Sequence, residues 1–307
     1  MTASVRWAAG IPQAWTTGEL DRSRIRRYLE RAEALGFESA WVVEQVLGVV
    51  PSLEPVELLA WAAALTERIR LGTAVLLTPL RSPVHLAKSL ATVDQLSNGR
   101  LDVGIGLGGG AKIYPAYGIT AARRVARFNE GLRLMRALWT EPRVTFAGEF
   151  WQLENAAMEP KPRQRPHPPL WVGAHHPDAL RRATGWAHGF MGAGSATTAA
   201  FAHEVGLLRG FLAEAGRDPG TMDVGKRVYI AVDPDRERAG RRLGEYFAAF
   251  YGRAQLAAEV SVWGSVDQCV EGVREVIAAG ARLVMLNPVF DELAQLELLA
   301  TEVVPRL

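Results

Sequence analysis

One glycine-rich stretch of the sequence could hold a phosphate or a flat ligand. Residues 104–109, GIGLGG, follow an apolar run and match the GxGxxG spacing of dinucleotide-binding loops. Such a loop needs a helix that begins inside it, yet Pro115 and Gly118 follow, and Glu130 falls within a later predicted helix. The spacing therefore argues against a Rossmann-type nicotinamide dehydrogenase. Two interpretations remain: a tight flexible loop, or a backbone surface that a flat ligand approaches because no Cβ obstructs it.

A second candidate site is the segment GAHHPD at residues 173–178. It joins a predicted strand to a predicted helix, so the backbone N–H groups of Ala174, His175 and His176 can face an anion such as a phosphate. Adjacent histidines do not readily face one metal ion, and no cluster of carboxylates accompanies them in the sequence. We therefore expect a phosphate site here and no metal site.

Glu44 is a carboxylate at the end of a predicted strand. It can serve there as an acid, a base or a hydrogen-bonding anchor, or as one half of an ion pair at the rim. The sequence contains no GxSxG nucleophile motif. Its single cysteine, Cys269, lies within a predicted helix and is expected to be a small buried apolar side chain. A nucleophilic residue is thus not indicated.

These residues must be positioned by a regular alternation of strands and helices. Eight short runs, nearly all apolar on both faces, predict strands at residues 5–11, 40–43, 69–77, 101–105, 170–173, 189–191, 224–232 and 283–286. Helices are predicted at residues 24–35, 55–65, 83–96, 121–139, 178–186, 198–215 and 266–279, with further helical sequence after Arg236. The pattern predicts an α/β fold, a (β/α)8 TIM barrel, with a doubly wound open sheet as the alternative.

The alternation is interrupted between the fourth and fifth predicted strands. Residues 144–153 predict a short hairpin around Gly148, and the stretch EPKPRQRPHPP at residues 159–169 holds five prolines, which exclude a helix or a central strand. We interpret residues 140–169 as an insertion within a single domain of residues 1–307. The insertion is expected to lie over one mouth of the barrel.

Composition limits the partners that the protein can have. The chain has 307 residues, and its formal net charge of +2 does not suggest a nucleic-acid-binding protein. One cysteine cannot form an intrachain disulfide, and no apolar run is long enough to span a bilayer. We therefore expect a cytoplasmic protein that acts on a small-molecule substrate and binds neither nucleic acid nor membrane.

Four motifs together carry a resemblance to a known family. They are AEALGFESAWVVEQ, LLAWAAALTERIRLGTAVLLTPLRSPVHLAKSLATVDQLSNGRLDVGIGLGG, PPLWVGAHHPDALRRA and GSVDQCVEGVREVIAAGARLVML. With them the chain resembles the luciferase-like monooxygenase superfamily, and within it the coenzyme F420-dependent oxidoreductases. The resemblance implies a luciferase-like TIM barrel with an insertion between strands 4 and 5. It also implies a homodimer that binds a reduced flavin or deazaflavin at the carboxyl-terminal mouth.

The resemblance implies roles for particular residues. A non-prolyl cis peptide bond is expected between Ala74 and Val75, beside Thr73, where the third strand bulges toward the cofactor ring. The other cofactor-binding residues that the resemblance implies are Leu107, Gly108, Gly109, Gly173, Ala174 and His175. Glu44 and Gln45 are the candidate catalytic residues. Gln45 replaces a histidine that is common in the family, and Gly109 replaces the glutamate that transfers a proton in the sugar-phosphate dehydrogenases.

The expected activity is hydride transfer between reduced coenzyme F420 and a small organic substrate. An FMN-dependent monooxygenase on the same barrel and a non-catalytic flavin-binding barrel remain as alternatives. Four aromatic residues are expected either to form walls of a substrate pocket or to pack in the ordinary core. They are Trp15, Tyr114, Tyr117 and Tyr229. Four cations are expected either to contact the polyglutamate tail of the deazaflavin or to be solvated surface charges. They are Lys112, Lys161, Arg163 and Arg165.

Overall fold

Eight parallel strands form a closed barrel in the computed structural model, which describes residues 4–16, 18–108 and 110–307. The strand β12 pairs with β1, and β10 pairs with both β9 and β12, so the ring is complete. The predicted TIM barrel is confirmed, and the open sheet is excluded. In ring order the strands are β1 (Arg6–Gly10), β2 (Ser39–Val42), β3 (Arg70–Thr73) with its continuation β4 (Leu76–Leu77), β5 (Leu101–Gly106), β8 (Leu170–Val172), β9 (Gly189–Gly192), β10 (Asp223–Val232) and β12 (Leu283–Asn287).

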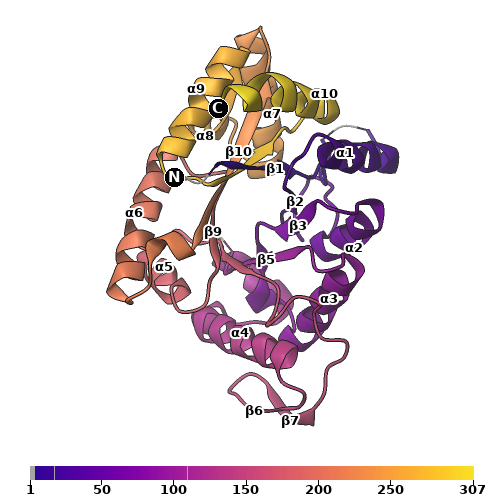
Figure 1. The fold of residues 1–307 in the computed structure, drawn as a ribbon, viewed down its shortest axis with the longest axis vertical. Coiled ribbons are helices and arrows are strands. Elements are labelled where there is room, and N and C mark those ends of the chain that lie inside the picture. Colours follow the sequence, from indigo (N-terminus) through magenta and orange to yellow (C-terminus); the bar gives the residue numbers. More distant parts are fainter. Residues whose placement is uncertain (1–3, 17, 109) are drawn as a thin grey trace.

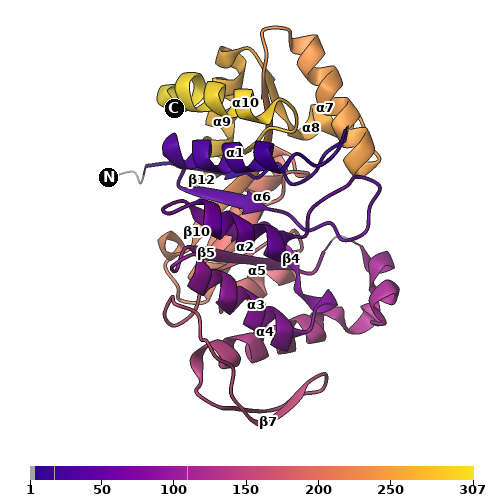
Figure 2. The same cartoon turned by 90° about the vertical axis from the view of Figure 1, so that its right-hand side faces the viewer.

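Helices pack around the outside of the barrel (Figure 1, Figure 2). They are α1 (Arg22–Ala34), α2 (Pro55–Leu65), α3 (Pro83–Leu96), α4 (Arg124–Thr140), α5 (Pro177–Ala183), α6 (Thr198–Glu214), α7 (Arg236–Tyr251), α8 (Leu256–Val260), α9 (Val266–Ala278) and α10 (Glu292–Leu298). Short helical segments are η1 (Thr78–Leu80), η2 (Ala111–Tyr117), η3 (Ala121–Arg123), η4 (Pro219–Thr221), η5 (Leu299–Val303) and η6 (Val304–Arg306). Local caps define several helix starts, such as Asp21, which accepts from the Ser23 and Arg24 N–H groups.

Two tryptophans fill the interior of the barrel. The rings of Trp41 and Trp171 meet edge to face, with centres 5.2 Å apart. Each ring lies against a strand glycine: a Cβ at Gly72 would lie 2.3 Å from the Trp41 ring, and one at Gly189 would lie 2.4 Å from the Trp171 ring. The rings can therefore occupy the barrel because these two positions carry no side chain. The other members of this cluster are Ala8, Met191, Leu283 and Met285.

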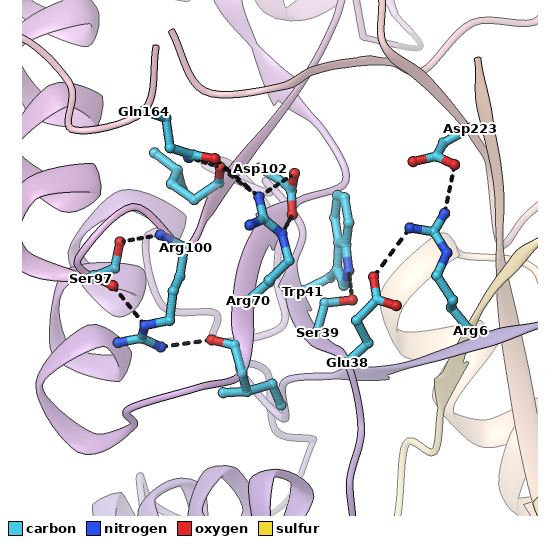
Figure 3. Close-up of polar contacts among 12 residues, drawn as sticks. Arg6, Glu38, Ser39, Trp41, Arg70, Ser97, Arg100, Asp102, Gln164 and Asp223 are labelled. Atoms are coloured by element: carbon cyan, nitrogen blue, oxygen red, sulfur yellow. Dashed lines mark hydrogen bonds and ion pairs between the residues drawn. The ribbon is translucent and has the colours of Figure 1, made fainter. Parts of the chain in front are cut away.

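Charged side chains at the amino ends of the strands pair with one another (Figure 3). Arg6, the first residue of β1, contacts Glu38 at 3.2 Å and Asp223 at 2.7 Å. Arg70, the first residue of β3, donates two hydrogen bonds to Asp102 at 2.7 and 2.9 Å. These pairs link β1 to the start of β2 and, across β12, to β10, and they link β3 to β5, at the end of the barrel that serves stability in this fold.

Arg100 joins α2 to the strands through backbone carbonyl groups. Its guanidinium donates to the carbonyl oxygens of Ala63 at 3.1 Å, Thr66 at 2.7 Å and Ile69 at 2.6 Å. The Nε atom donates to the Ser97 carbonyl at 2.7 Å (Figure 3). One buried side chain thus satisfies the last carbonyl groups of α2, which would otherwise have no partner.

The predicted hairpin is confirmed as the antiparallel pair β6 (Val144–Ala147) and β7 (Gln152–Ala156). It lies beside α4 at the edge of the molecule (Figure 1). Glu130 of α4 accepts hydrogen bonds from the backbone N–H groups of Glu149, Phe150 and Trp151 at 2.8 to 3.0 Å. This carboxylate therefore holds the turn of the hairpin against the helix.

The expectation that the insertion covers the mouth of the barrel is wrong. After β7 the chain runs to the opposite end, where the Gln164 side-chain amide donates to Asp94 and to the Leu101 carbonyl, both at 2.7 Å. Lys161 donates to the Leu138 carbonyl near the end of α4 at 2.8 Å. The segment therefore donates hydrogen bonds to groups near the ends of α3 and α4 and at the start of β5. Lys161 and its neighbours Arg163 and Arg165 thus do not reach the mouth.

Replacing Arg100 with methionine should lower the free energy of unfolding by about 3 kcal/mol or more, because several buried carbonyl groups lose their donor. Urea denaturation of the purified variant measures the change. Arg253→Met is the matched control, since Arg253 is exposed and makes no side-chain hydrogen bond or ion pair within the described residues; we expect a change within about 0.5 kcal/mol. Equal stability of the two variants would contradict the role assigned to Arg100.

Candidate active site

A cavity of about 510 Å³ opens at the carboxyl ends of the strands. Its walls come from the segments that follow β2, β3, β5, β8 and β9, together with β4, β10, the first turns of α4, α5 and the end of α7. The predicted site residues that line it are Glu44, Ala74, Val75, Leu107, Gly108, Gly173, Ala174 and His175. Segments that are far apart in the sequence therefore converge on one cavity at the end of the barrel where active sites of this fold lie.

Ala74 and Val75 form one wall of the cavity together with three glycines. The peptide bond between them is cis, as the sequence motif predicts. The Val75 methyl groups would lie 2.8 Å from a Cβ at Gly106 and 2.9 Å from a Cβ at Gly173. A Cβ at Gly108 would lie 3.0 Å from the Leu77 side chain. Side chains at these positions are thus excluded, and the wall is built largely from backbone.

Glu44, at the end of β2, accepts hydrogen bonds on both of its oxygens. Its Oε2 accepts from the Leu77 N–H at 2.5 Å, and its Oε1 accepts from Arg81 Nη2 at 2.6 Å. Its side chain is 1% exposed although the residue lines the cavity. Arg81 also pairs with Glu54. Burial lowers the pKa of Arg81, but the two carboxylates outweigh burial and raise it. The ion pair therefore fixes the segment after β4 against β2.

Two predicted site residues, Gln45 and Thr73, stand apart from the cavity. The Gln45 side chain turns toward Gly48 of its own loop, where a Cβ would lie 2.5 Å from Gln45 Nε2, and it does not line the cavity. Thr73 is fully buried, and its hydroxyl donates to the Gly104 carbonyl at 2.8 Å and accepts from the Gly104 N–H at 2.9 Å. Gly109 lies outside the residues that the structure describes.

The aromatic walls differ from those expected. Trp15 lines a separate hollow, and the buried Tyr114 donates to the Leu107 carbonyl at 2.7 Å from behind the glycine loop. Tyr117 and Tyr229 do not line the cavity either. The aromatic residues that do line it are Phe128, Trp186, Phe250 and Tyr251. Their helical spacing did not distinguish them from ordinary core residues in the sequence.

Cations without a carboxylate partner gather around the cavity. Arg124, Arg182 and Arg227 line it, and none of them has a carboxylate oxygen within 4.0 Å among the described residues. The sequence analysis did not select these residues. A signal was nevertheless present for Arg227, because it lies with Lys226 in a predicted strand that is otherwise apolar.

His175 and Lys226 each make polar contacts beside the cavity. The exposed His175 places its Nδ1 2.6 Å from Oε1 of the buried Glu204, and this hydrogen bond raises the pKa of His175 although desolvation opposes the shift. Lys226 is buried and donates to the carbonyl oxygens of Ala193 and Ala196, the latter at 2.8 Å. Desolvation lowers the pKa of Lys226 to about 8, although Glu204 opposes that shift. Lys226 thus holds the loop that contributes Ala193 to the cavity lining.

Cys269 lies away from the cavity, within α9. Its side chain is fully buried, and desolvation raises the pKa of its thiol to about 12. Across residues 4–16, 18–108 and 110–307, no group of three or more His, Cys, Asp or Glu side chains could hold a metal ion. In the same part of the chain, no helix combines the length and the apolar character needed to cross a bilayer.

Replacing Glu204 with glutamine should lower the pKa of His175, because the acceptor loses the negative charge that stabilises the imidazolium. In the wild type His175 should remain protonated above the pH range in which histidine ordinarily titrates. In Glu204→Gln it should lose its proton at lower pH. NMR of labelled histidine, assigned with His175→Gln, measures both titrations. His176, in the same segment, is the internal control. An unchanged His175 titration in Glu204→Gln would contradict the assignment.

Among the proteins similar to this chain, some match it in part and others over nearly the whole length of both chains. An uncharacterised protein of Mycobacterium tuberculosis is 41% identical over 140 residues, 44% of this chain and 49% of that protein, so the chain spans about half the length of this relative. An F420-dependent glucose-6-phosphate dehydrogenase of Beutenbergia cavernae is 30% identical over 319 residues, 91% of this chain and 92% of that protein.

Solved structures and family models agree with the fold described above. The crystal structure of the monooxygenase RslO1 from Streptomyces bottropensis is similar, with a TM-score of 0.83, 27% identity and coverage of 98% of this chain and 99% of that chain. The family model of the luciferase-like monooxygenases matches residues 4–261. The match covers most of the barrel, including every strand that contributes to the cavity. The chain therefore belongs to the luciferase-like monooxygenase family.

Proposed function

We propose that the protein is an oxidoreductase that transfers a hydride between reduced coenzyme F420 and a small organic substrate. The observation that carries this proposal is the cavity wall of Ala74, Val75, Gly106, Gly108 and Gly173, in which three glycines and two small side chains leave room for a flat ring. The dehydrogenase of Beutenbergia cavernae, which is similar over nine-tenths of both chains, is named as F420-dependent.

The residues around the cavity fit such a cofactor. A Cβ at Gly106 or Gly108 would clash with the side chain of Val75 or Leu77, so glycine lets these side chains pack closely against the strand ends that line the cavity. Arg124 and Arg182 supply positive charge for a phosphodiester, and the adjacent backbone at Gly173 and Ala174 lines the same side. When bound, the deazaflavin supplies the hydride chemistry, and the protein supplies binding, orientation and electrostatics.

In this proposal Glu44 acts as an anchor and not as a proton donor. Both of its oxygens accept from Leu77 and Arg81, so a proton on either oxygen would oppose an existing donor. The pair instead holds the backbone after β4 in the position that the cavity wall requires. Phe128 and Trp186, which line the cavity, exclude water from the reacting groups.

An FMN-dependent monooxygenase is the second candidate function. The observation that favours it is the similarity to the monooxygenase RslO1 at 27% identity over nearly the whole chain. The two candidates differ in their reaction with oxygen. Oxygen consumption that depends on FMN and on an organic substrate, without reaction of F420, would support the monooxygenase.

Coenzyme F420 should bind more tightly than FMN, and salt should weaken its binding, because Lys112, Arg124 and Arg182 can meet the phosphodiester and the acidic tail. Fluorescence titration of both cofactors at low and high ionic strength measures this difference. Arg182→Met should weaken F420 binding roughly three- to tenfold. Arg163→Met is the matched control at the opposite end of the barrel and should have no effect. Equal or tighter binding of FMN at low salt would remove the deazaflavin assignment.

The protein should not oxidise glucose 6-phosphate at an ordinary enzyme rate. Gly109 stands where the resembling sugar-phosphate dehydrogenases carry a proton-transferring glutamate, and such a group contributes roughly 10²- to 10⁴-fold to the rate. Loss of F420 absorbance in the presence of glucose 6-phosphate tests this directly. A dehydrogenase such as the Beutenbergia cavernae relative is the positive control. Rapid reduction of F420 by glucose 6-phosphate would show that another residue transfers the proton.

A further inference from the structure

Arg227 is a buried cation in the wall of the cavity that nothing in the proposed function uses. It projects from β10 and is 8% exposed. It lines the main cavity and also the small hollow beneath it, next to Phe250. Gly194 lies directly against its stem, since a Cβ there would be 3.2 Å from Arg227 Cγ and Cδ. The side chain thus occupies a fitted position within the barrel.

Two contacts fix the orientation of the Arg227 guanidinium. Its Nε donates to Asn287 Oδ1 at 2.6 Å, and the Asn287 amide nitrogen donates in turn to the Pro288 carbonyl at 3.2 Å. The guanidinium also lies over the Tyr229 ring, 4.5 Å from its centre. Neither Nη group makes a hydrogen bond within the described residues. Four N–H donors of a rigidly held side chain therefore remain without an acceptor.

The charge of Arg227 is also uncompensated. The ionisable groups closest to it are the phenols of Tyr229, Tyr246 and Tyr251, and no carboxylate oxygen lies within 4.0 Å among the described residues. Other buried arginines of the chain are satisfied, as Arg100 is by carbonyl groups. A buried charge without a partner costs several kcal/mol, and an anionic ligand removes that cost.

We propose that Arg227 binds an anionic oxygen of the substrate through its free Nη groups, so that the substrate is an organic anion with a flat apolar body. The apolar body is inferred from the apolar and aromatic residues that line the same cavity as Arg227, among them Met191, Phe250 and Tyr251. The Arg227 donors can hold a carboxylate or a phenolate in a bidentate manner. This inference rests on the proposed function for the reaction, but the binding of the anion can be tested without any cofactor.

The test compares acids with their neutral amides as probes. Benzoate and 1-naphthoate, against benzamide and 1-naphthamide, are titrated into the cofactor-free protein at low ionic strength, with quenching of tryptophan fluorescence as the readout. The wild type should bind at least one acid about tenfold or more tightly than its amide, as expected for charge-assisted hydrogen bonds. Absence of this preference for both pairs overturns the proposal.

Two substitutions locate the preference at Arg227. Arg227→Met should abolish the preference for acids, and Arg182→Met, which removes another cavity cation, should retain it. Asn287→Asp keeps the Arg227 charge but supplies an internal carboxylate at the same hydrogen bond, so it should also abolish the preference. Thermal melting of each variant reports folding, and Asn287→Asp decides the matter if Arg227→Met does not fold. Persistence of the preference in a folded Arg227→Met or Asn287→Asp variant overturns the proposal.

Titration of F420 into the same variants separates this inference from the proposed function. If the wild type binds no F420 but prefers acids through Arg227, the proposed function fails and the anion site stands. If Arg227→Met and Asn287→Asp lose F420 affinity while the preference for acids persists, Arg227 belongs to the cofactor site and the inference is overturned. Unchanged F420 binding together with loss of the preference is the expected result.

Discussion

The close contact between the third barrel strand and the glycines of its neighbours is the constraint on which the cavity depends. A Cβ at Gly104 would lie 1.8 Å from the Thr73 carbonyl oxygen, and the Thr73 hydroxyl bonds to both backbone groups of Gly104. Two residues later Val75 fills the space above Gly106 and Gly173. Three strands are thereby locked in one register, and the wall they form carries backbone where another barrel would carry side chains.

Arginines at the two ends of the barrel differ in their partners. At the amino end Arg6 and Arg70 pair with carboxylates, and these pairs help to hold the strands together. At the carboxyl end Arg81 is paired as well, but Arg124, Arg182 and Arg227 have no carboxylate partner among the described residues. Of these three only Arg227 is buried, and a buried charge reduces stability unless a ligand compensates it.

Much of the fold could be predicted from the sequence, since parallel strands covered on both faces are apolar throughout and their boundaries are marked by glycine and proline. The short strand β11 (Val262–Gly264), which extends the sheet beside β10, was missed because three residues carry no periodicity. The path of the proline-rich segment was also beyond prediction. Prolines exclude helix and central strand, but the contacts of Gln164 with Asp94, far away in sequence, determine where the segment lies.

The candidate site was predictable where a motif coincides with a strand end, as at Glu44, Ala74 and Gly173. It was not predictable where the direction of a side chain determines whether the residue lines the cavity. Gln45 is such a case, because its side chain turns toward its own loop. Arg227 shows a second limit of prediction from the sequence. A charge in an apolar strand indicates that a partner is needed, but the sequence does not say whether that partner is a protein group or a ligand.

A wall made of backbone also restricts how this barrel can diverge or be redesigned. Side chains cannot be introduced at Gly104, Gly106 or Gly173 without displacing the third strand, so this part of the barrel is closed to stepwise variation. Variation of the cavity is left to lining residues such as Trp186, Phe250 and Tyr251, which come from helices and loops. Mutant libraries directed at those positions reshape the cavity while the register of the strands stays constant.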